Sequence, residues 1–293
     1  MWQQKSFEKE GTKSALYLVP TPIGNLEDMS FRAVRILKEA DVIAAEDTRN
    51  TRKLCNYFEI DTPIVSYHEH NKQTSGKKII DRLLEGQTVA LVSDAGMPTI
   101  SDPGFELVTE ALKEQITVIP LPGANAALTA LIASGLVPQP FYFYGFLPRN
   151  TKEKRQDLER LKKVTCTWII YESPHRLKET LKLILDVLGD RRIVLSRELT
   201  KKFEEFIRGS VSEMLQWAAE SEIRGEFCLV IEGNSIEQSD VDEDENWWDG
   251  MKIAEHVDYY IHKQKLHSKE AIKQTAKDRG MNKRDVYQAY HIE

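Results

Sequence analysis

The chain has 293 residues, of which 41% are hydrophobic and 29% charged, so it has the composition of a soluble folded protein and room for two compact α/β units. Its net charge of −6 gives no support to nucleic-acid binding but does not exclude it, because seven acidic residues fall within residues 236–249. Cys55, Cys166 and Cys228 form no CxxC pair, have no His at ligand spacing and are odd in number, which argues against a zinc site and a disulfide framework. Without a signal-peptide core or an apolar run long enough to span a bilayer, we expect a cytoplasmic protein with no membrane partner.

The first half of the chain alternates short β-type apolar runs with helical periodicity. Strands are expected at residues 15–19, 41–46, 63–68, 88–93 and 116–121, and helices at 31–40, 52–58, 79–86 and 124–135. This alternation predicts βαβ units and a largely parallel sheet. We therefore expect an N-terminal α/β domain over residues 14–134.

A second α/β domain is expected over residues 135–234, after a hinge-like segment that contains two prolines and a glycine. Strands are expected at residues 141–147, 166–172, 191–199 and 227–233, and helices at 152–163, 176–189 and 212–219. Ser210 and Glu213 form the pattern of a capping box at the start of the last of these helices. The fold class is thus α/β, with two domains.

The C-terminal part of the chain has a different composition. Residues 235–250 have the composition of an acidic linker, and residues 251–293 predict a small helical tail. Ser268 and Asn282 are plausible helix N-caps, with a glycine between the last two helices. Such an arrangement is compatible with a helix-turn-helix, although plain three-helix packing is the simpler interpretation.

Five loops that follow predicted strands are rich in Gly, Pro and acidic residues. They cover residues 19–25, 45–49, 92–104, 121–126 and 171–176. Open α/β sheets bind ligands at the carboxyl ends of their strands, so the five loops predict a shared cleft. Taken singly, each loop is also explained as a turn. In the third loop, Asp102 would be a helix N-cap and Pro103 the first helical residue. The chain lacks GxGxxG after its first strand and has no GxxxxGK[ST], which argues against dinucleotide and P-loop binding.

The sequence also resembles a known family. The matching blocks are LYLVPTPIGNLEDMSFRA, AEDTRNTRKL, SYHEHN, VSDAGMPTISDPG, LPGANAALTAL, IIYESPHR and GEFCLVIEG, in order from about Leu16 to Gly233. Together they are similar to the ribosomal RNA small subunit methyltransferase I family of the tetrapyrrole-methylase-like (class III) methyltransferases. One departure from many small-molecule members is Met97, which stands where those members carry an acid.

This resemblance implies two tetrapyrrole-methylase-like α/β domains with S-adenosylmethionine bound in the cleft between them, in a homodimer. It implies methylation of a cytidine ribose 2'-hydroxyl in 16S ribosomal RNA, with the small ribosomal subunit as the expected partner. The cofactor contacts that it implies are Pro20, Gly96, Met97, Ile100, Asn125, Ala126, Tyr171, Leu199 and Phe227. No metal is implied, and His68 and His70 have no third ligand in evidence that would make a metal site.

A ribose hydroxyl is a weak nucleophile, so a general base or a nearby cation would assist the transfer. Among the acids at strand ends we predict Asp47 and Glu172 as catalytic residues, and Arg49, Arg176 and Arg197 as substrate-binding cations. The alternative is that these carboxylates only cap loops or pair with neighbouring arginines. The basic helix 152–163 is another candidate for gripping phosphate, or is simply a solvated helix face.

Two other functions compete with this prediction. One is a relative that methylates a tetrapyrrole or another small molecule, which would not need the basic helix or the tail. The other is a ligand-sensing helix-turn-helix regulator, which would need a clearly basic recognition helix. Residues 282–290 contain only two basic residues and one acidic residue, which disfavours the regulator.

Overall fold

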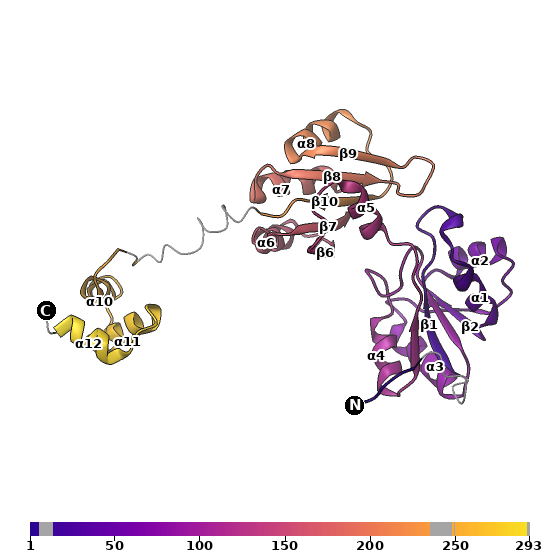
Figure 1. Cartoon of the computed structure of the whole chain (residues 1–293), viewed down its shortest axis with the longest axis horizontal. Helices are drawn as coiled ribbons and strands as arrows, with labels where there is room; N and C mark the ends of the chain where they lie inside the picture. The colour runs from indigo at the N-terminus through magenta and orange to yellow at the C-terminus, as the bar shows by residue number, and fades with distance from the viewer. Residues whose placement is uncertain (6–13, 235–247, 249, 292–293) are drawn as a thin grey trace. The chain divides into compact units, whose positions relative to one another are not determined.

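The computed structural model describes residues 1–5, 14–234, 248 and 250–291. These residues form two compact units, a body within residues 1–234 and a tail within residues 235–293 (Figure 1). The stretch expected to be an acidic linker lies almost wholly outside the described residues. In the described parts of the chain, no helix has the length and apolar character needed to cross a membrane.

The first sheet of the body contains five parallel strands in the order β3-β2-β4-β1-β5 (Figure 1). They are β1 (Ala15–Val19), β2 (Val42–Ala45), β3 (Ile64–Ser66), β4 (Val89–Val92) and β5 (Thr117–Pro120). The helices are α1 (Phe31–Glu39), α2 (Thr48–Tyr57), α3 (Lys72–Leu84) and α4 (Phe105–Lys113), with a short 3-10 helix, η1 (Leu26–Asp28). Side chains from β1 enter two separate apolar clusters, Val19 in one and Leu16 in the other, so the strand is buried on both faces.

The second sheet has the order β6-β7-β10-β8-β9 and is mixed. Its strands are β6 (Phe141–Phe146), β7 (Thr167–Glu172), β8 (Arg192–Arg197), β9 (Glu205–Ser210) and β10 (Phe227–Ile231). Only β6 and β7 pair in parallel; β10 lies antiparallel between β7 and β8, and β9 pairs antiparallel with β8. The largely parallel arrangement predicted for the first half is therefore not repeated in this half. The strands predicted for this half do not include β9, because its sequence EFIRGS contains only two apolar residues.

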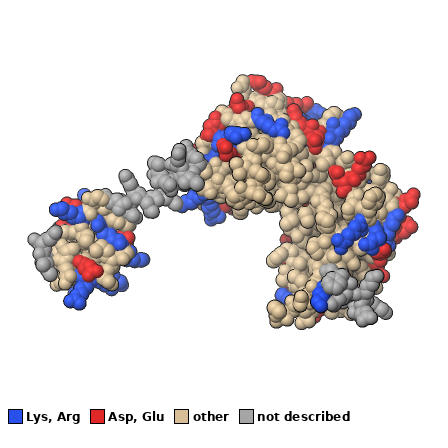
Figure 2. Space-filling view, viewed as in Figure 1, with Lys and Arg blue, Asp and Glu red and all other residues tan. Residues whose placement is uncertain are grey.

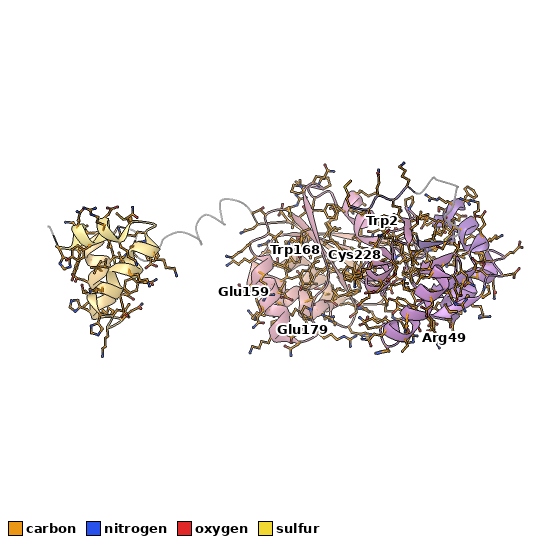
Figure 3. All side chains as sticks on the ribbon, turned by 90° about the horizontal axis from the view of Figure 1, so that it is seen from below. Trp2, Arg49, Glu159, Trp168, Glu179 and Cys228 are labelled. Carbon is orange, nitrogen blue, oxygen red and sulfur yellow. The ribbon has the colours of Figure 1, made fainter. Side chains whose placement is uncertain are left out.

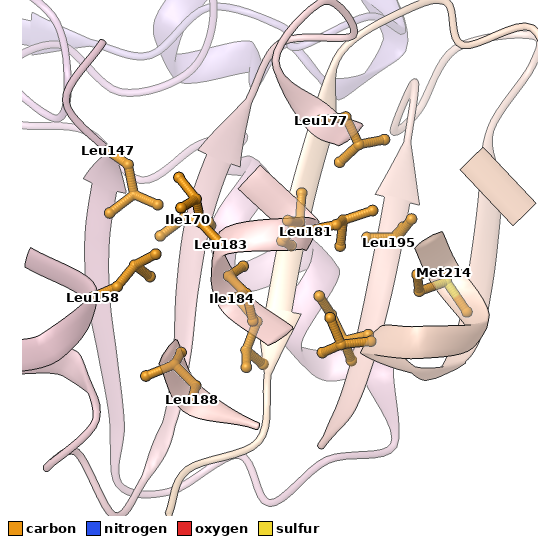
Figure 4. Packing of buried hydrophobic residues seen from close by; sticks show 14 of the residues in the cluster. Leu147, Leu158, Ile170, Leu177, Leu181, Leu183, Ile184, Leu188, Leu195 and Met214 are labelled. Carbon is orange, nitrogen blue, oxygen red and sulfur yellow. The ribbon is translucent and has the colours of Figure 1, made fainter. Parts of the chain in front are cut away.

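Helices cover both faces of the second sheet. They are α6 (Thr151–Leu161), α7 (Leu177–Leu188) and α8 (Val211–Glu220) around one core cluster, and α5 (Ala126–Ser134) in another. Figure 4 shows Leu181 of α7 beside Leu195 of β8 in the first of these cores. The predicted capping box at α8 is confirmed, because Ser210 and Glu213 each accept a hydrogen bond from the other's backbone N–H.

Helix α5 belongs by sequence to the first half but packs against the second sheet. Its residues Ala127, Ala130 and Leu131 share a core cluster with Ile169 of β7 and Val230 of β10. The predicted N-terminal domain, residues 14–134, includes this helix. The chain thus enters the second half's core before it reaches the hinge-like segment that follows the helix.

The tail consists of α10 (Ile253–His262), α11 (Ser268–Asp278) and α12 (Lys283–His291) around their own apolar cluster. Arg279 ties the unit together by donating hydrogen bonds to His256 Nδ1 and to the carbonyls of Trp248 and Met251. The N-cap of α11 is His267 and not the predicted Ser268, which is the first helical residue.

Candidate functional site

A cavity of about 500 Å³ opens in the body at the ends of several strands. It is lined by residues that follow strands of both sheets. Eight of the nine predicted cofactor contacts lie in its wall: Gly96, Met97, Ile100, Asn125, Ala126, Tyr171, Leu199 and Phe227. The predicted catalytic Glu172 is also in the wall, whereas Pro20, Asp47, Arg49, Arg176 and Arg197 are not among the lining residues.

The loop after β4 is fixed by hydrogen bonds to the loop after β1. Thr21 and Gly96 exchange two backbone hydrogen bonds of 2.9 and 3.0 Å, and Thr21 Oγ1 donates to the carbonyl of Ser93. Gly96 has a φ of +79°, a conformation that glycine adopts without strain. Thr99 and Ser101 have φ values of +72° and +63°, which are costly for residues with a Cβ. The pocket's first wall therefore depends on an unusual, firmly held backbone path.

Pro20 supports this wall from behind. It is buried, and a Cβ added to Gly123 would lie only 2.5 Å from the Pro20 Cβ. The glycine therefore allows the loop after β5 to pack directly onto the loop after β1. Such packing positions the residues that begin α5, two of which line the cavity.

The N-terminus of α5 is capped twice, once from each half. Asn125 Oδ1 accepts a hydrogen bond of 2.9 Å from the backbone N–H of Leu128, and the Tyr171 hydroxyl accepts one of 3.2 Å from that of Ala127. Burial raises the pKa of Tyr171, so its hydroxyl stays protonated at neutral pH. The same ring contacts Phe146 edge-on, with centroids 5.4 Å apart, and forms an aromatic side of the pocket.

Glu172 is buried and both of its carboxylate oxygens have partners. Thr180 Oγ1 donates to Oε2 over 2.6 Å, and the backbone N–H of Ser173 donates to Oε1 over 2.8 Å. Arg176 Nε lies 3.4 Å from Oε1. The Thr180 hydroxyl also meets the ammonium of Lys154 at 3.2 Å. This chain of buried contacts, which we call the Glu172 network, joins α6, α7 and the end of β7.

Lys154 belongs to the helix that was predicted to be either solvated or phosphate-binding. Its side chain is 0% exposed, so it cannot reach a phosphate at the surface. Neighbouring members of the same helix, such as Lys152 and Arg155, are exposed. The helical spacing alone did not distinguish the one inward-pointing lysine from the others.

Asp47 lies at the surface at the start of α2. It caps that helix by accepting a hydrogen bond of 2.8 Å from the N–H of Arg49, and its other oxygen meets the Arg49 guanidinium at 2.8 Å. The hydrogen bonds from Arg49 lower the pKa of Asp47 to about 2. The Arg49 side chain is 86% exposed, and Figure 3 shows it on the outside of the body. Asp47 therefore has the geometry of a cap and a weak proton acceptor.

The other two predicted substrate cations are engaged within the body. Arg176 Nη2 donates to the carbonyls of Leu147 and Pro148 at 2.7 and 2.9 Å, which joins the end of β6 to the end of β7. Arg197 lies 3.3 Å from Glu205, and its guanidinium carbon is 6.0 Å from the centroid of the Phe227 ring, which lines the cavity. Both arginines therefore lie behind the pocket wall.

Three carboxylates outside the predicted site residues lie on one side of the cavity, although Glu46 is among the acids at strand ends that the sequence offers as a base. Asp94 and Asp102 line it, and Glu46 stands close enough to raise the pKa of Asp102. Asp102 is not the N-cap of α4 as interpreted from the sequence, because that helix begins at Phe105 with Gly104 as its N-cap. Its carboxylate receives no hydrogen bond from any residue that the structure describes and lies in the pocket wall. The sequence does show an acid in a long Gly- and Pro-rich loop after a strand, which is a signal that sequence reasoning could have used.

The lining suits a cationic ligand that carries an aromatic base. Apolar side chains such as Met97, Ile100 and Phe227 offer surface to a ring, while the carboxylates Asp94 and Asp102 balance positive charge. Ser196, which is fully buried in the wall, has a hydroxyl without a hydrogen-bond partner among the described residues. Figure 2 shows the surface between the two sheets as largely uncharged, with charged side chains gathered over α2 and around β8 and β9.

Other chemistries find less support in the residues that the structure describes. Burial raises the pKa of the Cys228 thiol to about 12, so this pocket residue is not a thiolate at neutral pH. No cluster of three or more His, Cys, Asp or Glu side chains in the described segments could hold a metal ion. His68 and His70 stand with ring centroids 6.0 Å apart and gain no third partner of this kind.

Comparison with known proteins identifies close relatives. A family model described as Tetrapyrrole (Corrin/Porphyrin) Methylases matches residues 15–215. "Ribosomal RNA small subunit methyltransferase I" of Bacillus subtilis (strain 168) is 62% identical over 99% of this chain and 98% of its own length. The protein of the same name from Halalkalibacterium halodurans is 59% identical, with both chains fully covered, and that of Streptococcus pyogenes is 47% identical over 99% of each.

Solved structures show the same fold at low sequence identity. The cobalamin biosynthetic enzyme cobalt precorrin-4 methyltransferase aligns with a TM-score of 0.58 at 18% identity, covering 78% of this chain and 98% of that one. Uroporphyrin-III C-methyl transferase from Thermus thermophilus, complexed with S-adenyl homocysteine, aligns with a TM-score of 0.55 at 19% identity, covering 74% and 97%. The chain therefore belongs to the ribosomal RNA small subunit methyltransferase I family within the tetrapyrrole methylases, and it is an S-adenosylmethionine-dependent methyltransferase.

Proposed function

We propose that this enzyme transfers a methyl group from S-adenosylmethionine to the ribose 2'-hydroxyl of a cytidine in 16S ribosomal RNA, with the small ribosomal subunit as the substrate. The observation that carries the proposal is identity of 62% over essentially the whole chain to a relative named for small-subunit ribosomal RNA methylation. A pocket whose shape and charge suit a sulfonium-bearing nucleoside supports the choice of methyl donor. We also propose that the enzyme works in the cytoplasm.

The cofactor would be held by the lining residues of the cavity. The backbone around Gly96 and Ala126 would offer peptide groups, and Tyr171 and Phe227 would offer apolar surface. The sulfonium of the bound donor supplies an electrophilic methyl group. The protein's main task is then to hold the ribose oxygen in line with that methyl group.

The predicted site residues divide by their surroundings. Arg49 pairs with Asp47 but its side chain is 86% exposed on the outside of the body, and we propose that it contacts a phosphate of the RNA. Arg176 and Arg197 would act from behind the pocket by holding strand ends in place. The two predicted bases, Asp47 and Glu172, are both already hydrogen-bonded by neighbouring groups.

A homodimer is also part of the proposal. Large apolar side chains are exposed on α5, in the segment between α5 and β6, and on β6, which is an edge strand of the second sheet in the described residues. They are Leu128, Ile132, Val137, Phe141, Tyr142 and Phe146. An apolar patch of this kind marks a protein–protein contact. Replacing Ile132, which is 81% exposed, with Lys should shift the mass measured by light scattering from dimer to monomer.

The function is tested by methyl transfer from labelled cofactor to small ribosomal subunits isolated from a strain that lacks the protein. We expect label in 16S RNA at a single cytidine, in a dinucleotide that resists alkaline hydrolysis because its 2'-oxygen is blocked. Label on a base, or on no RNA at all, would contradict the proposal. Naked 16S RNA in parallel distinguishes the assembled subunit from free RNA as the substrate.

A further inference from the structure

We infer that Asp102 is the catalytic base that accepts the proton of the ribose hydroxyl, an assignment that rests on the function proposed above. Asp102 lies in the pocket wall, on the same loop as the predicted cofactor contacts Met97 and Ile100. No described residue donates a hydrogen bond to its carboxylate or pairs with it. It is thus a proton acceptor whose lone pairs are available to a substrate.

The competing carboxylates are occupied. Asp47 caps α2, pairs with Arg49, and has a pKa of about 2, at which a carboxylate is a poor proton acceptor. Glu172 accepts hydrogen bonds on both oxygens from within the protein. Asp94 accepts from the backbone N–H of Asp47 over 3.2 Å and from Asn50 Nδ2 over 3.4 Å. Glu226, the fourth acid in the lining, pairs with the ammonium of Lys201 over 2.8 Å. Among these four acids, Asp102 is therefore the one whose carboxylate accepts no hydrogen bond from the residues that the structure describes.

The backbone on either side of Asp102 holds the side chain in place. Thr99 and Ser101 adopt positive φ values, and strain of this kind persists only where the surroundings enforce it. A Cβ on Gly104 would lie 2.8 Å from Thr99 Cγ2, so the loop folds closely back on itself after Asp102. A Cβ on Gly145 of β6 would lie 3.2 Å from Ser101 Oγ, so the loop also abuts the second sheet. Two halves of the body thus fix the position of one carboxylate.

The charged surroundings of Asp102 favour proton uptake near neutral pH. Burial, then the negative charges of Glu46 and Asp94, raise the pKa of Asp102 from 3.8 to about 7. The Tyr171 hydroxyl is the other titratable group that interacts with it, and that hydroxyl stays neutral. A base with a pKa close to the working pH combines a large ionised fraction with good proton affinity.

The step balances without a further reactant. The ribose 2'-oxygen forms a bond to the methyl carbon as the carbon–sulfur bond breaks, and the electron pair of that bond remains on sulfur. The hydroxyl proton passes to an Oδ atom of Asp102, which becomes neutral. The products are the 2'-O-methyl ribose and S-adenosylhomocysteine, and Asp102 returns its proton to solvent before the next turnover.

The test is the variant Asp102→Asn, measured in single-turnover transfer to small ribosomal subunits. We expect the rate to fall by roughly 10²–10⁴, while cofactor affinity measured by calorimetry changes by less than about threefold. For the unmodified enzyme, the rate should rise with pH and level off above about pH 7. The variant should lose this rise, because no group with that pKa remains in the base position.

Glu46→Gln serves as a matched variant, because Glu46 does not line the cavity but raises the pKa of Asp102 by its charge. It should move the midpoint of the pH–rate profile to lower pH and lower the plateau rate far less than Asp102→Asn does, because the base is weakened but not removed. A purely structural role for Asp102 would not produce this shift.

A third measurement requires no turnover. The folded state holds the Asp102 proton more tightly than the unfolded state, so this group stabilises the protein fully below about pH 4, and the contribution is lost as pH rises through about 7. The Tm of the cofactor-free protein should therefore fall less between pH 5 and pH 8 in Asp102→Asn than in the unmodified protein.

Three outcomes would overturn the assignment. If the unmodified enzyme transfers methyl and the Asp102→Asn variant does so at an equal rate, Asp102 is not the base, and the proposed function stands. A loss of rate confined to Asp47→Asn or Glu172→Gln would move the role to that residue. An unmodified enzyme that transfers no methyl to the ribose would refute the proposed function, and the base with it.

Discussion

The two halves of the body build their sides of the pocket in different ways. In the parallel first half, the wall is made of backbone: long strand-end loops, held by the Thr21–Gly96 pairing and by residues with positive φ. In the mixed second half, side chains at strand ends form the wall, and the buried Glu172 network fixes them from behind. Parallel strands are connected by crossovers that leave loops at one edge of the sheet. The Glu172 network of the second half instead joins the end of β7 to side chains of α6 and α7.

This difference predicts where substitutions act. In the second half, loss of one charge should cost stability and pocket shape together, because a low-dielectric interior makes an unpaired ion expensive. In the first half, changes of backbone conformation should affect ligand binding more than the loss of a surface charge does. The following variants test both statements, from the largest effect to the smallest.

Glu172→Gln keeps the size of the side chain but removes the negative charge that faces Lys154 through Thr180 and that faces Arg176 directly. The free energy of unfolding in urea should fall by about 2 kcal/mol, because the Thr180 hydroxyl and the Arg176 guanidinium lose a charged acceptor, while Lys154 keeps Glu179 at 3.6 Å. Cofactor affinity should fall as well, since the neighbouring Ser173 and Pro174 line the pocket. Adding Lys154→Met should recover part of the stability, and a double variant that is no more stable than the single one would contradict the network.

Gly96→Ala tests the backbone wall of the first half. With φ at +79°, the alanine should cost about 1 kcal/mol of stability and weaken cofactor binding, because the loop must shift to relieve the strain. Gly135→Ala is the matched control: its φ is +77° and a Cβ there meets nothing within 4 Å. Gly135→Ala should lose a similar amount of stability in thermal unfolding, but its cofactor affinity measured by calorimetry should not change. An equal loss of affinity in both variants would show that Gly96→Ala does not act locally on the pocket.

Asp47→Ala should have the smallest effect of the three. It removes the N-cap of α2 and should lower the free energy of unfolding by about 1 kcal/mol, whereas Asp47→Asn, which retains capping ability, should lose less. Cofactor binding should not change in either variant, because Asp47 does not line the cavity. Calorimetric affinity reduced tenfold or more would show that the start of α2 forms part of the pocket.

Much of the site could be predicted because strand ends in an α/β fold are marked by Gly, Pro and acidic residues. The stretches around Gly96, Asn125 and Tyr171 were found in this way and do line one cavity. Their individual roles could not be predicted, since a motif gives the position of a side chain but not its partners. Glu172 and Asp47 both carry a carboxylate. Only the fold shows that Glu172 is buried in a hydrogen-bond network and that Asp47 caps a surface helix.

The parts of the fold that were missed share a physical cause. Strand β9 has few apolar residues because it is an edge strand, paired only with β8, so its periodicity is weak. Helix α4 follows a loop in which Asp102 and Pro103 have the sequence pattern of a helix start, two residues before the observed N-cap, Gly104. Lys154 lies among other basic residues and is distinguished only by the helix face that packs against Thr180.

The packing of α5 on the second sheet has a consequence for how the chain can be divided. The chain's natural seam for split-protein reassembly or circular permutation lies between β5 and α5, near Leu121 to Ala124, and not after Gly135. Fragments cut at that seam would keep the helix with the sheet whose core it covers. A cut after Gly135 would strip the second fragment of Ala130 and Leu131 and expose Val230 to solvent, so those fragments should reassemble poorly.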